Sequence, residues 1–356
     1  MRYNLLGNTG LKVSQFCLGT MGFGGRGFFK MAGTLDQAAA DMHLRHAVEA
    51  GINFIDTANI YSTGLSEEIT GQAIRNLGLT RDNLVLSTKV RGSMGDGPNE
   101  TGLSRKHIMQ QVEASLRRLQ TDYLDLYQIH CIDPLTPLEE TLRVLDDLVR
   151  SGKVRYIGAS NLAAWQLMKG LAISERQYLE KFASLQAYYS LATRELEREL
   201  IPLVQDQRLG LLICSPLAGG LLSGKYQRDQ STPVGGRLDA GNLIPVDQDR
   251  AFAILAVLRS LAEDKNVTVA QLSLAWLLHQ PAVSSVIIGA TTLTQLADNI
   301  AAGSVTFTPD ELQQLDAVSQ IPAEYPAWLI NLSNADRLPT APLATDFNIQ
   351  REVLVS

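Results

Sequence analysis

Eight short apolar runs, each of four to seven residues, recur along the 356-residue chain. They begin at Phe16, Phe54, Leu84, Leu124, Tyr156, Leu185, Leu211 and Ser285. Between them, apolar residues return every three or four positions over residues 36–50, 66–77, 104–119, 138–150 and 293–302, a period that predicts amphipathic helices. The sequence therefore alternates strands with helices at intervals of about one βα unit, except for a longer interval before the last run.

Strands that are apolar along their whole length indicate a sheet covered on both faces, because an exposed face would carry alternating polar residues. Eight such strands with helices between them match a closed parallel (β/α)8 barrel of the TIM type. An open, doubly wound sheet with extra helices is the main alternative, but the regular spacing and the even composition favour the barrel. We expect a single domain over residues 1–356, with its core at about 2–316.

Three segments fall outside the repeating unit. Residues 2–16, RYNLLGNTGLKVSQF, predict a β-hairpin that turns at residues 8–10 and plugs the bottom of the barrel ahead of the first strand. Residues 223–248 are rich in Gly, Pro, Asp and Gln, which predicts a long loop before the last units. Residues from about 320 to 356 carry several prolines and little periodicity, so we expect an irregular C-terminal tail.

The composition argues against several classes of protein. Apolar residues make up 45% of the chain and the formal net charge is −6, which allows a large core but disfavours a phosphate-binding basic surface. We therefore expect neither a nucleic-acid nor a membrane partner. The three cysteines lie far apart without CxxC spacing, which is typical of free thiols rather than of disulfides or a zinc site. With no secretory signal pattern at the start, these features favour a cytoplasmic protein.

The polar residues that close the strands indicate where chemistry takes place, because catalytic residues of such barrels lie at the carboxyl ends of the strands. Asp56, Lys89 and His130 close the second, third and fourth runs, and Tyr61 follows the second. Taken singly, Asp56 has an ordinary explanation as a turn former, Lys89 as a solvated charge at a strand end and His130 as a core histidine. Tyr61 alone is explained by packing against a helix that Ser66 caps. Three ionisable groups that close three consecutive strands converge over one barrel mouth, which predicts an active site there.

Six segments resemble the successive signature segments of the aldo-keto reductases. In chain order they are GINFIDTANIYSTGLSEEITGQAI, LVLSTKV, DYLDLYQIHCIDPLTPLEET, SGKVRYIGASN, LQAYYSL and SVIIGATTLTQLADNIAA. The similarity extends over about residues 2–316 in the expected order. It implies a (β/α)8 barrel that binds a nicotinamide dinucleotide without a Rossmann fold, and it places the catalytic tetrad of the family on Asp56, Tyr61, Lys89 and His130.

The residue types of this tetrad suit hydride transfer to a carbonyl group. Hydride that reaches the carbonyl carbon leaves negative charge on the oxygen, so a proton donor and a partner for the oxyanion are needed. We expect Tyr61 to donate the proton and the Lys89 ammonium to bring the pKa of Tyr61 down towards the working range. Asp56 is expected to pair with Lys89 and hold it. His130 is expected to hydrogen-bond the substrate oxygen, a role that does not require it to be charged.

The resemblance also implies binding residues. Ser160, Asn161 and Gln186 would hold the nicotinamide carboxamide, a group that both donates and accepts hydrogen bonds. The other residues implied at the cofactor site are Gly19, Thr20, Met21, Asp56, Cys214, Ser215, Leu217, Gly219, Leu221, Lys225, Gly289, Thr291, Gln295 and Asn299. The residues expected at the substrate are Phe23, Tyr61 and His130, and with Phe28 and Phe29 the first loop suggests an apolar wall. No metal site is expected.

The sequence departs from the family pattern in two segments. Cys214 stands where the family usually has a Tyr or Trp that stacks on the nicotinamide. Thr291, Thr292 and Gln295 stand where many relatives place Lys or Arg near the adenosine end. We therefore expect NADPH to be preferred by a smaller margin than in relatives with a basic side chain at that place, with NADH usable as well.

The sequence thus predicts an NAD(P)H-dependent reductase that converts aldehydes or ketones to alcohols, reversibly. One alternative is an enzyme that works mainly as an alcohol or sugar dehydrogenase. Another is a cofactor-binding regulatory subunit, because the β-subunits of ion channels share this barrel and tetrad. An unrelated barrel hydrolase would need a metal cluster or a carboxylate pair, which the strand ends do not show. Turnover by the purified protein separates enzyme from regulatory subunit, and the oligomeric state stays open.

Overall fold

The structure, a computed structural model, describes residues 1–228 and 245–334. Residues 1–320 form one compact unit and residues 321–356 a second. The strands are β1 (Tyr3–Leu5), β2 (Lys12–Ser14), β3 (Phe16–Gly19), β4 (Phe54–Asp56), β5 (Val85–Val90), β6 (Leu124–Ile129), β7 (Val154–Ser160), β8 (Phe182–Tyr188), β9 (Gly210–Cys214) and β10 (Val283–Ile288). The helices of the first unit are α1 (Gln37–Glu49), α2 (Leu65–Asn76), α3 (Arg105–Leu119), α4 (Leu138–Arg150), α5 (Ala164–Gln177), α6 (Leu200–Asp206), α7 (Gln248–Lys265), α8 (Val269–Leu278), α9 (Leu293–Ala301) and α10 (Pro309–Ser319).

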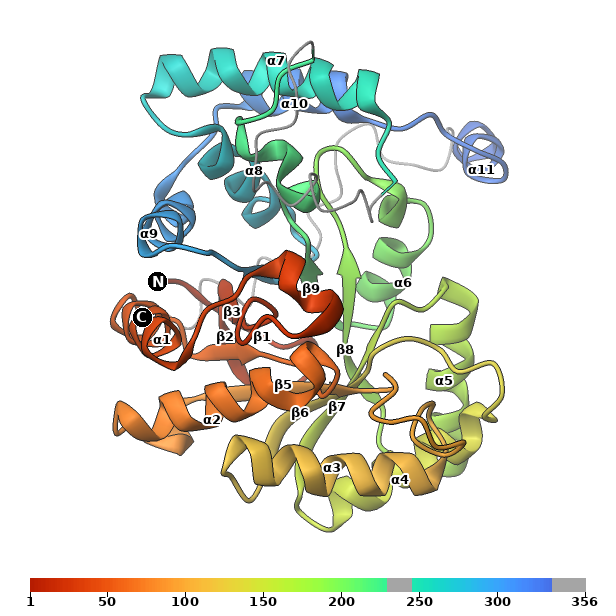
Figure 1. The fold of residues 1–356 in the computed structure, drawn as a ribbon. Coiled ribbons are helices and arrows are strands. Elements are labelled where there is room, and N and C mark those ends of the chain that lie inside the picture. The colour runs from red at the N-terminus through yellow and green to blue at the C-terminus, as the bar shows by residue number, and fades with distance from the viewer. Residues whose placement is uncertain (229–244, 335–356) are drawn as a thin grey trace, which may run out of the picture. The chain divides into compact units, whose positions relative to one another are not determined.

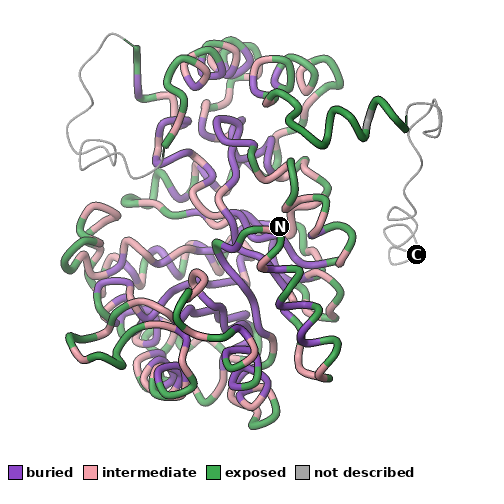
Figure 2. Tube along the Cα trace, turned by 90° about the vertical axis from the view of Figure 1, so that its right-hand side faces the viewer, coloured by how far each residue is buried: buried purple, intermediate pink, exposed green. Residues whose placement is uncertain are grey.

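The strands β3 to β10 close into a parallel barrel, in the order β10-β3-β4-β5-β6-β7-β8-β9, with helices around it (Figure 1). These are the eight apolar runs, so the predicted (β/α)8 barrel is confirmed. The five helices expected from periodicity agree with α1, α2, α3, α4 and α9 to within one residue at each end. Strands β5 and β6 are buried at every position, and Figure 2 shows buried chain running through the middle of the molecule. Burial on both faces explains why the strands lack polar alternation.

The N-terminal hairpin closes the amino-terminal end of the barrel, as predicted. Strands β1 and β2 pair antiparallel, and Leu6 and Val13 are fully buried in an apolar cluster with inward residues of the barrel strands, such as Cys17 and Phe54. The connection requires glycine at Gly7, because its φ is +58° and an added Cβ would collide with the backbone of Gly210.

The long interval between β9 and β10 contains α7 and α8, which explains its length. Residues 229–244 of the predicted loop lie outside the described residues. In the second unit, the tail expected to be irregular contains one short helix, α11 (Ala327–Ser333), which starts directly after Pro326. Residues 335–356 of the expected tail lie outside the described residues. A proline costs no hydrogen bond there, and Ala and Leu are good helix formers. Within the described parts of the chain, no helix has the length and apolar character needed to cross a bilayer.

Candidate active site

The four residues of the expected tetrad come together at the carboxyl ends of three neighbouring strands. Asp56 ends β4, Lys89 lies one residue before the end of β5, and His130 follows β6. Tyr61 opens a 3₁₀ turn, Tyr61–Gly64, that leads into α2. Lys89 Nζ lies 2.5 Å from Asp56 Oδ2 and 3.3 Å from the Tyr61 hydroxyl. The rings of Tyr61 and His130 meet edge to face with centroids 5.8 Å apart.

Three neutral side chains complete the surroundings of the Asp56 carboxylate. Its Oδ1 accepts hydrogen bonds from Ser87 Oγ at 3.0 Å, Gln128 Nε2 at 3.1 Å and Gln186 Nε2 at 3.2 Å. Ser87 and Gln128 were not among the site residues expected from the sequence. A signal was present, because Ser87 lies two residues before Lys89 in β5 and Gln128 lies two residues before His130, which directly follows β6, so that each faces the barrel interior beside it.

The Lys89 ammonium has a full set of three acceptors although its side chain is completely buried. Besides Asp56 and Tyr61 it donates to the backbone oxygen of Thr57 at 2.9 Å. Burial by itself would lower the pKa of Lys89, but the charge of Asp56 and the contact with Tyr61 raise that pKa above its usual value. The barrel therefore holds a permanent positive charge next to the Tyr61 hydroxyl.

The pKa of Tyr61 departs from the expectation. Burial raises it more than the Lys89 charge lowers it, so the pKa of Tyr61 lies above its ordinary value rather than below it. The sequence showed the neighbouring cation but not the burial of the ring, which is 9% exposed. At neutral pH the phenol is therefore protonated and can act as a proton donor.

His130 is uncharged at neutral pH. Burial, together with the charges of Lys89 and Arg91, lowers its pKa to about 3. Its backbone nitrogen donates to Val90 at 2.9 Å, and its backbone oxygen accepts from Asn161 Nδ2 at 2.9 Å. A neutral imidazole held beside Tyr61 can offer an N–H to a substrate oxygen.

The turn that carries Tyr61 has an unusual backbone. Ser62, Thr63 and Gly64 have φ values of 49°, 54° and 90°, three left-handed residues in succession. Ser66 does not cap α2 as expected, because the helix begins at Leu65. The Ser66 hydroxyl instead donates to Thr20 O at 2.7 Å, and the Ser62 hydroxyl donates to Phe23 O at 3.1 Å. The loop after β3 therefore anchors the turn.

The residues implied at the cofactor site occupy or follow the carboxyl ends of β3, β7, β8, β9 and β10. Since the barrel strands are parallel, this is the same rim as the tetrad. By position in the chain these residues are Gly19, Thr20 and Met21 at β3; Ser160 and Asn161 at β7; Gln186 in β8; Cys214, Ser215, Leu217, Gly219, Leu221 and Lys225 at and after β9; and Gly289, Thr291, Gln295 and Asn299 after β10.

Several of these side chains are bonded or packed within the protein itself, which the sequence did not indicate. Gln186 donates to Asp56, and Thr20 Oγ1 lies 3.3 Å from Asp56 O and 3.0 Å from Ser66 Oγ. Leu221 is 2% exposed and belongs to the apolar core. Asn299 is 6% exposed and donates to Gly289 O at 3.3 Å. The Leu221 side chain is therefore part of the core, and the Asn299 amide holds the backbone of the loop that follows β10.

The residues expected near the adenosine end of the cofactor lie around the start of α9. Gln295 Oε1 accepts from the nitrogen and the hydroxyl of Thr291 at 3.0 and 2.9 Å, and Thr292 caps the helix by accepting from Gln295 N at 3.2 Å. This end of the site therefore offers hydrogen bonds and a helix N-terminus at the positions where many relatives carry a basic side chain.

The aromatic residues of the first loop divide into two groups. Phe23, expected at the substrate, is 2% exposed and packs with Ala40 and Ile69 of α1 and α2. Phe29 instead meets Tyr61, with centroids 5.3 Å apart, and Phe28, 63% exposed, meets Phe29 at 5.5 Å. The phenylalanine ring beside Tyr61 therefore comes from the 3₁₀ turn Gly27–Ala32, while Phe23 packs beneath the loop against α1 and α2.

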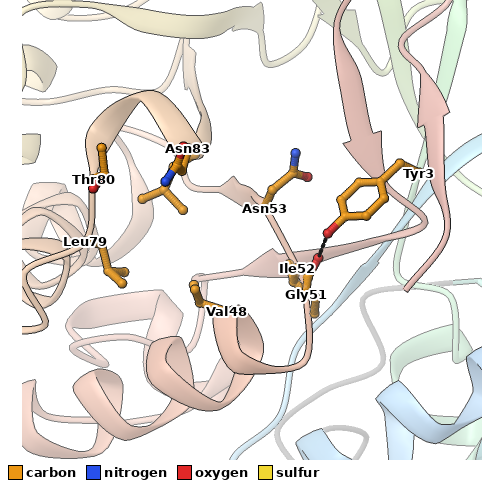
Figure 3. Close-up of a pocket in the computed structure, with 9 residues that line it drawn as sticks. Tyr3, Val48, Gly51, Ile52, Asn53, Leu79, Thr80 and Asn83 are labelled. Atoms are coloured by element: carbon orange, nitrogen blue, oxygen red, sulfur yellow. Dashed lines mark hydrogen bonds between the residues drawn. The ribbon is translucent and has the colours of Figure 1, made fainter.

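A hollow of about 200 Å³ at the other end of the barrel does not share this chemistry. Figure 3 shows Tyr3 and Asn53 at this hollow, with the Tyr3 hydroxyl donating to Gly51 O at 2.8 Å. Asn53 Oδ1 accepts a hydrogen bond from the backbone nitrogen of Ser14, and Asn53 Nδ2 donates one to the backbone oxygen of Lys12. Across residues 1–228 and 245–334, no group of three His, Cys, Asp or Glu side chains is placed to hold a metal.

Comparison with known proteins agrees with this geometry. The model of the aldo/keto reductase family matches residues 15–320. A versiconal hemiacetal acetate reductase from Aspergillus parasiticus is 38% identical over 336 residues, 89% of this chain and 96% of the relative. YrpG, an uncharacterized oxidoreductase from Bacillus subtilis (strain 168), is 38% identical over 326 residues, with the same coverage. A probable voltage-gated potassium channel subunit beta from Oryza sativa subsp. japonica is 38% identical over 328 residues, 90% of this chain and 97% of the relative. The chain therefore belongs to the aldo/keto reductase family and is an NAD(P)-dependent oxidoreductase.

Proposed function

We propose that the protein reduces aldehydes or ketones to alcohols, with NADPH as the preferred cofactor and Tyr61 as the proton donor. The observation that carries this proposal is the buried chain Asp56–Lys89–Tyr61 at the barrel mouth. The Tyr61 phenol in this chain is protonated at neutral pH. The phenolate left after proton transfer would lie 3.3 Å from the permanently charged Lys89 ammonium. The three free thiols of the chain are compatible with a reducing cytoplasm, where we place the protein.

The residues at the rim fit a nicotinamide dinucleotide. Ser160 and Asn161 offer a hydroxyl and an amide to a carboxamide. Left-handed backbone at Ser215, Ala218 and Gly220 bends the segment after β9, a geometry in which backbone N–H groups can converge on phosphate. Among the residues that the structure describes, a Cβ added at Gly289 would meet only Gly19 O, at 3.9 Å, so the backbone is open to close approach.

Cys214 replaces the expected stacking aromatic with a small, polarizable side chain. Burial raises the pKa of its thiol to about 11, so it stays neutral at physiological pH. We infer that it contributes apolar contact surface at the end of β9 rather than a nucleophile.

The protein groups have separate roles in the proposed reaction. A bound nicotinamide cofactor supplies the hydride. Tyr61 gives its proton to the substrate oxygen, and Lys89 stabilises the phenolate that remains. Asp56 holds Lys89, and neutral His130 orients the substrate oxygen through an imidazole N–H. Because the pKa of Tyr61 is raised, the protonated form dominates at neutral pH, which favours reduction over alcohol oxidation.

A regulatory role is the second candidate, because one relative with 38% identity is named as a probable channel β-subunit. The same barrel could serve as a cofactor-loaded subunit without turnover. The contact network of Tyr61, Lys89 and His130 is compatible with both roles, because channel β-subunits share the tetrad, and steady-state turnover decides between the two.

The test is Tyr61→Phe, measured with NADPH and a panel of carbonyl compounds. It removes the proton donor and keeps the ring, so turnover should fall by about 10²- to 10⁴-fold. The Kd for NADPH, followed by fluorescence titration, should stay nearly unchanged. Tyr3→Phe is the matched control, because it removes a tyrosine hydroxyl at the opposite end of the barrel and should leave turnover intact. If Tyr61→Phe keeps more than half of the wild-type turnover when chemistry limits the rate, the proposal fails.

A further inference from the structure

Glu67 is a buried carboxylate that has no part in the reaction described above. It lies in the first turn of α2 and its side chain is completely buried. Its Oε2 accepts from Arg118 Nε of α3 at 2.7 Å, and its Oε1 accepts from Thr88 Oγ1 of β5 at 2.6 Å. Burying an ion pair gives little net stability compared with apolar packing. The elements that the Glu67 carboxylate connects, α2, α3 and β5, therefore indicate a role other than stability.

Both partners of the catalytic Tyr61–Lys89 contact are tied to Glu67. Thr88 directly precedes Lys89, and because side chains alternate along a strand, Thr88 faces the helices while Lys89 faces the barrel interior. On the other side, only the turn after Tyr61 and the start of α2 separate Tyr61 from Glu67. The Glu67 carboxylate thus fixes the start of α2 against the strand that carries Lys89.

The turn between Tyr61 and Glu67 needs such support. Ser62 and Thr63 are in the left-handed region, which is unfavourable for residues with a Cβ and persists only where the surroundings hold it. Arg118 closes over the last residue of the turn, since a Cβ added at Gly64 would lie 2.9 Å from Arg118 Cδ. The same guanidinium side chain therefore covers the turn and pairs with Glu67.

We propose that Arg118 and Glu67 are positioning residues, whose ion pair holds the strained turn so that the Tyr61 hydroxyl stays within reach of Lys89. This inference rests on the proposed role of Tyr61 as proton donor. At 3.3 Å the Tyr61–Lys89 contact is already long for a hydrogen bond, so a small shift of the turn would break it. Tyr61 would then lose the charge that partly offsets its burial.

The test compares Arg118→Met with Arg118→Lys. In Arg118→Met, kcat should fall by about 10- to 100-fold, because a displacement of about 1 Å is enough for such a loss. KM and the Kd for NADPH should stay near wild type. The rise of alcohol oxidation with pH, which follows ionisation of Tyr61, should move to higher pH because the phenolate loses its neighbouring cation. Arg118→Lys keeps the charge and should restore part of both kcat and the pH profile.

Arg81→Met is the matched control. Arg81 pairs with Asp125 at 2.6 Å, the two side chains are 19% and 11% exposed, and Asp125 also accepts from the backbone of Leu86 near the start of β5. This variant removes a similar ion pair from the other end of the same strand. It should lower the Tm without changing kcat or the pH profile.

Thr88→Val tests the inference independently if Arg118→Met does not fold. It keeps the shape of the side chain and removes the hydrogen bond to Glu67, so it should shift kcat and the pH profile in the same direction by a smaller amount. If Arg118→Met, or Thr88→Val in its place, keeps the wild-type kcat and pH profile, the inference is overturned while the proposed function stands. If wild type shows no turnover, or Tyr61→Phe retains it, the proposed function fails instead.

Discussion

Lys89→Met should destabilise the protein through the carboxylate that it leaves behind. Methionine has a similar length and volume, so the change removes the ammonium with little change in packing. Asp56 is 2% exposed and would lose its charged partner at 2.5 Å, while keeping Ser87, Gln128 and Gln186 as neutral donors. Breaking a buried ion pair from one side typically costs about 3–5 kcal/mol. We expect a loss in this range for the free energy of unfolding.

Asp56→Asn breaks the same pair from the other side. The Lys89 ammonium would keep Thr57 O and the Tyr61 hydroxyl as neutral partners, so a loss of similar size is expected. The double variant removes both charges and leaves neither uncompensated. Its cost should therefore be smaller than the sum of the two single costs by about 1–3 kcal/mol.

Urea unfolding followed by circular dichroism, without cofactor, measures all four proteins. A constant slope m shows that the comparison reports stability rather than a change in the unfolded state. Lys181→Met is the control, because Lys181 pairs with Glu175 on the surface, with side chains 52% and 69% exposed, and exposed pairs contribute about 0–1 kcal/mol. Losses below about 1 kcal/mol in both single variants, or strict additivity in the double variant, would refute this account of the buried pair.

Two further predictions concern the cofactor and His130. Gln295→Arg should tighten NADPH binding by about 10-fold or more and leave NADH binding nearly unchanged. The reason is that a guanidinium adds a charge-assisted contact to the 2′-phosphate, which NADH lacks. Equal gains for both cofactors in fluorescence titrations would place Gln295 away from that phosphate. The pKa of His130 is lowered to about 3 in the folded protein. Between about pH 6.5 and 3 the unfolded chain therefore takes up a proton at His130 that the folded chain does not. The free energy of unfolding falls as the pH decreases through this window. His130→Gln should lack this component, up to about 1.4 kcal/mol per pH unit, and identical pH dependences of urea unfolding in the two proteins would contradict the lowered pKa.

Much of the fold follows from local pattern. Strands such as β5 and β6 are buried along their whole length, so their apolar runs stand out in the sequence, and the helices between them carry a period that local sequence shows directly. The tetrad was visible for a related reason. In a parallel barrel the carboxyl ends of all strands share one rim, so residue types at strand ends are enough to indicate that Asp56, Lys89 and His130 meet.

The sequence by itself therefore determined the barrel, its hairpin, and which ionisable groups gather at its mouth, because these depend on periodicity and order along the chain. Only the tertiary structure decided how those groups behave. The raised pKa of Tyr61 depends on how completely its ring is buried, and the contact of Tyr61 with Phe29 rather than Phe23 depends on how the first loop folds. The link from Glu67 to Arg118 joins residues that are far apart in sequence. Burial and distances between such residues arise only when the chain is packed, so no local pattern contains them.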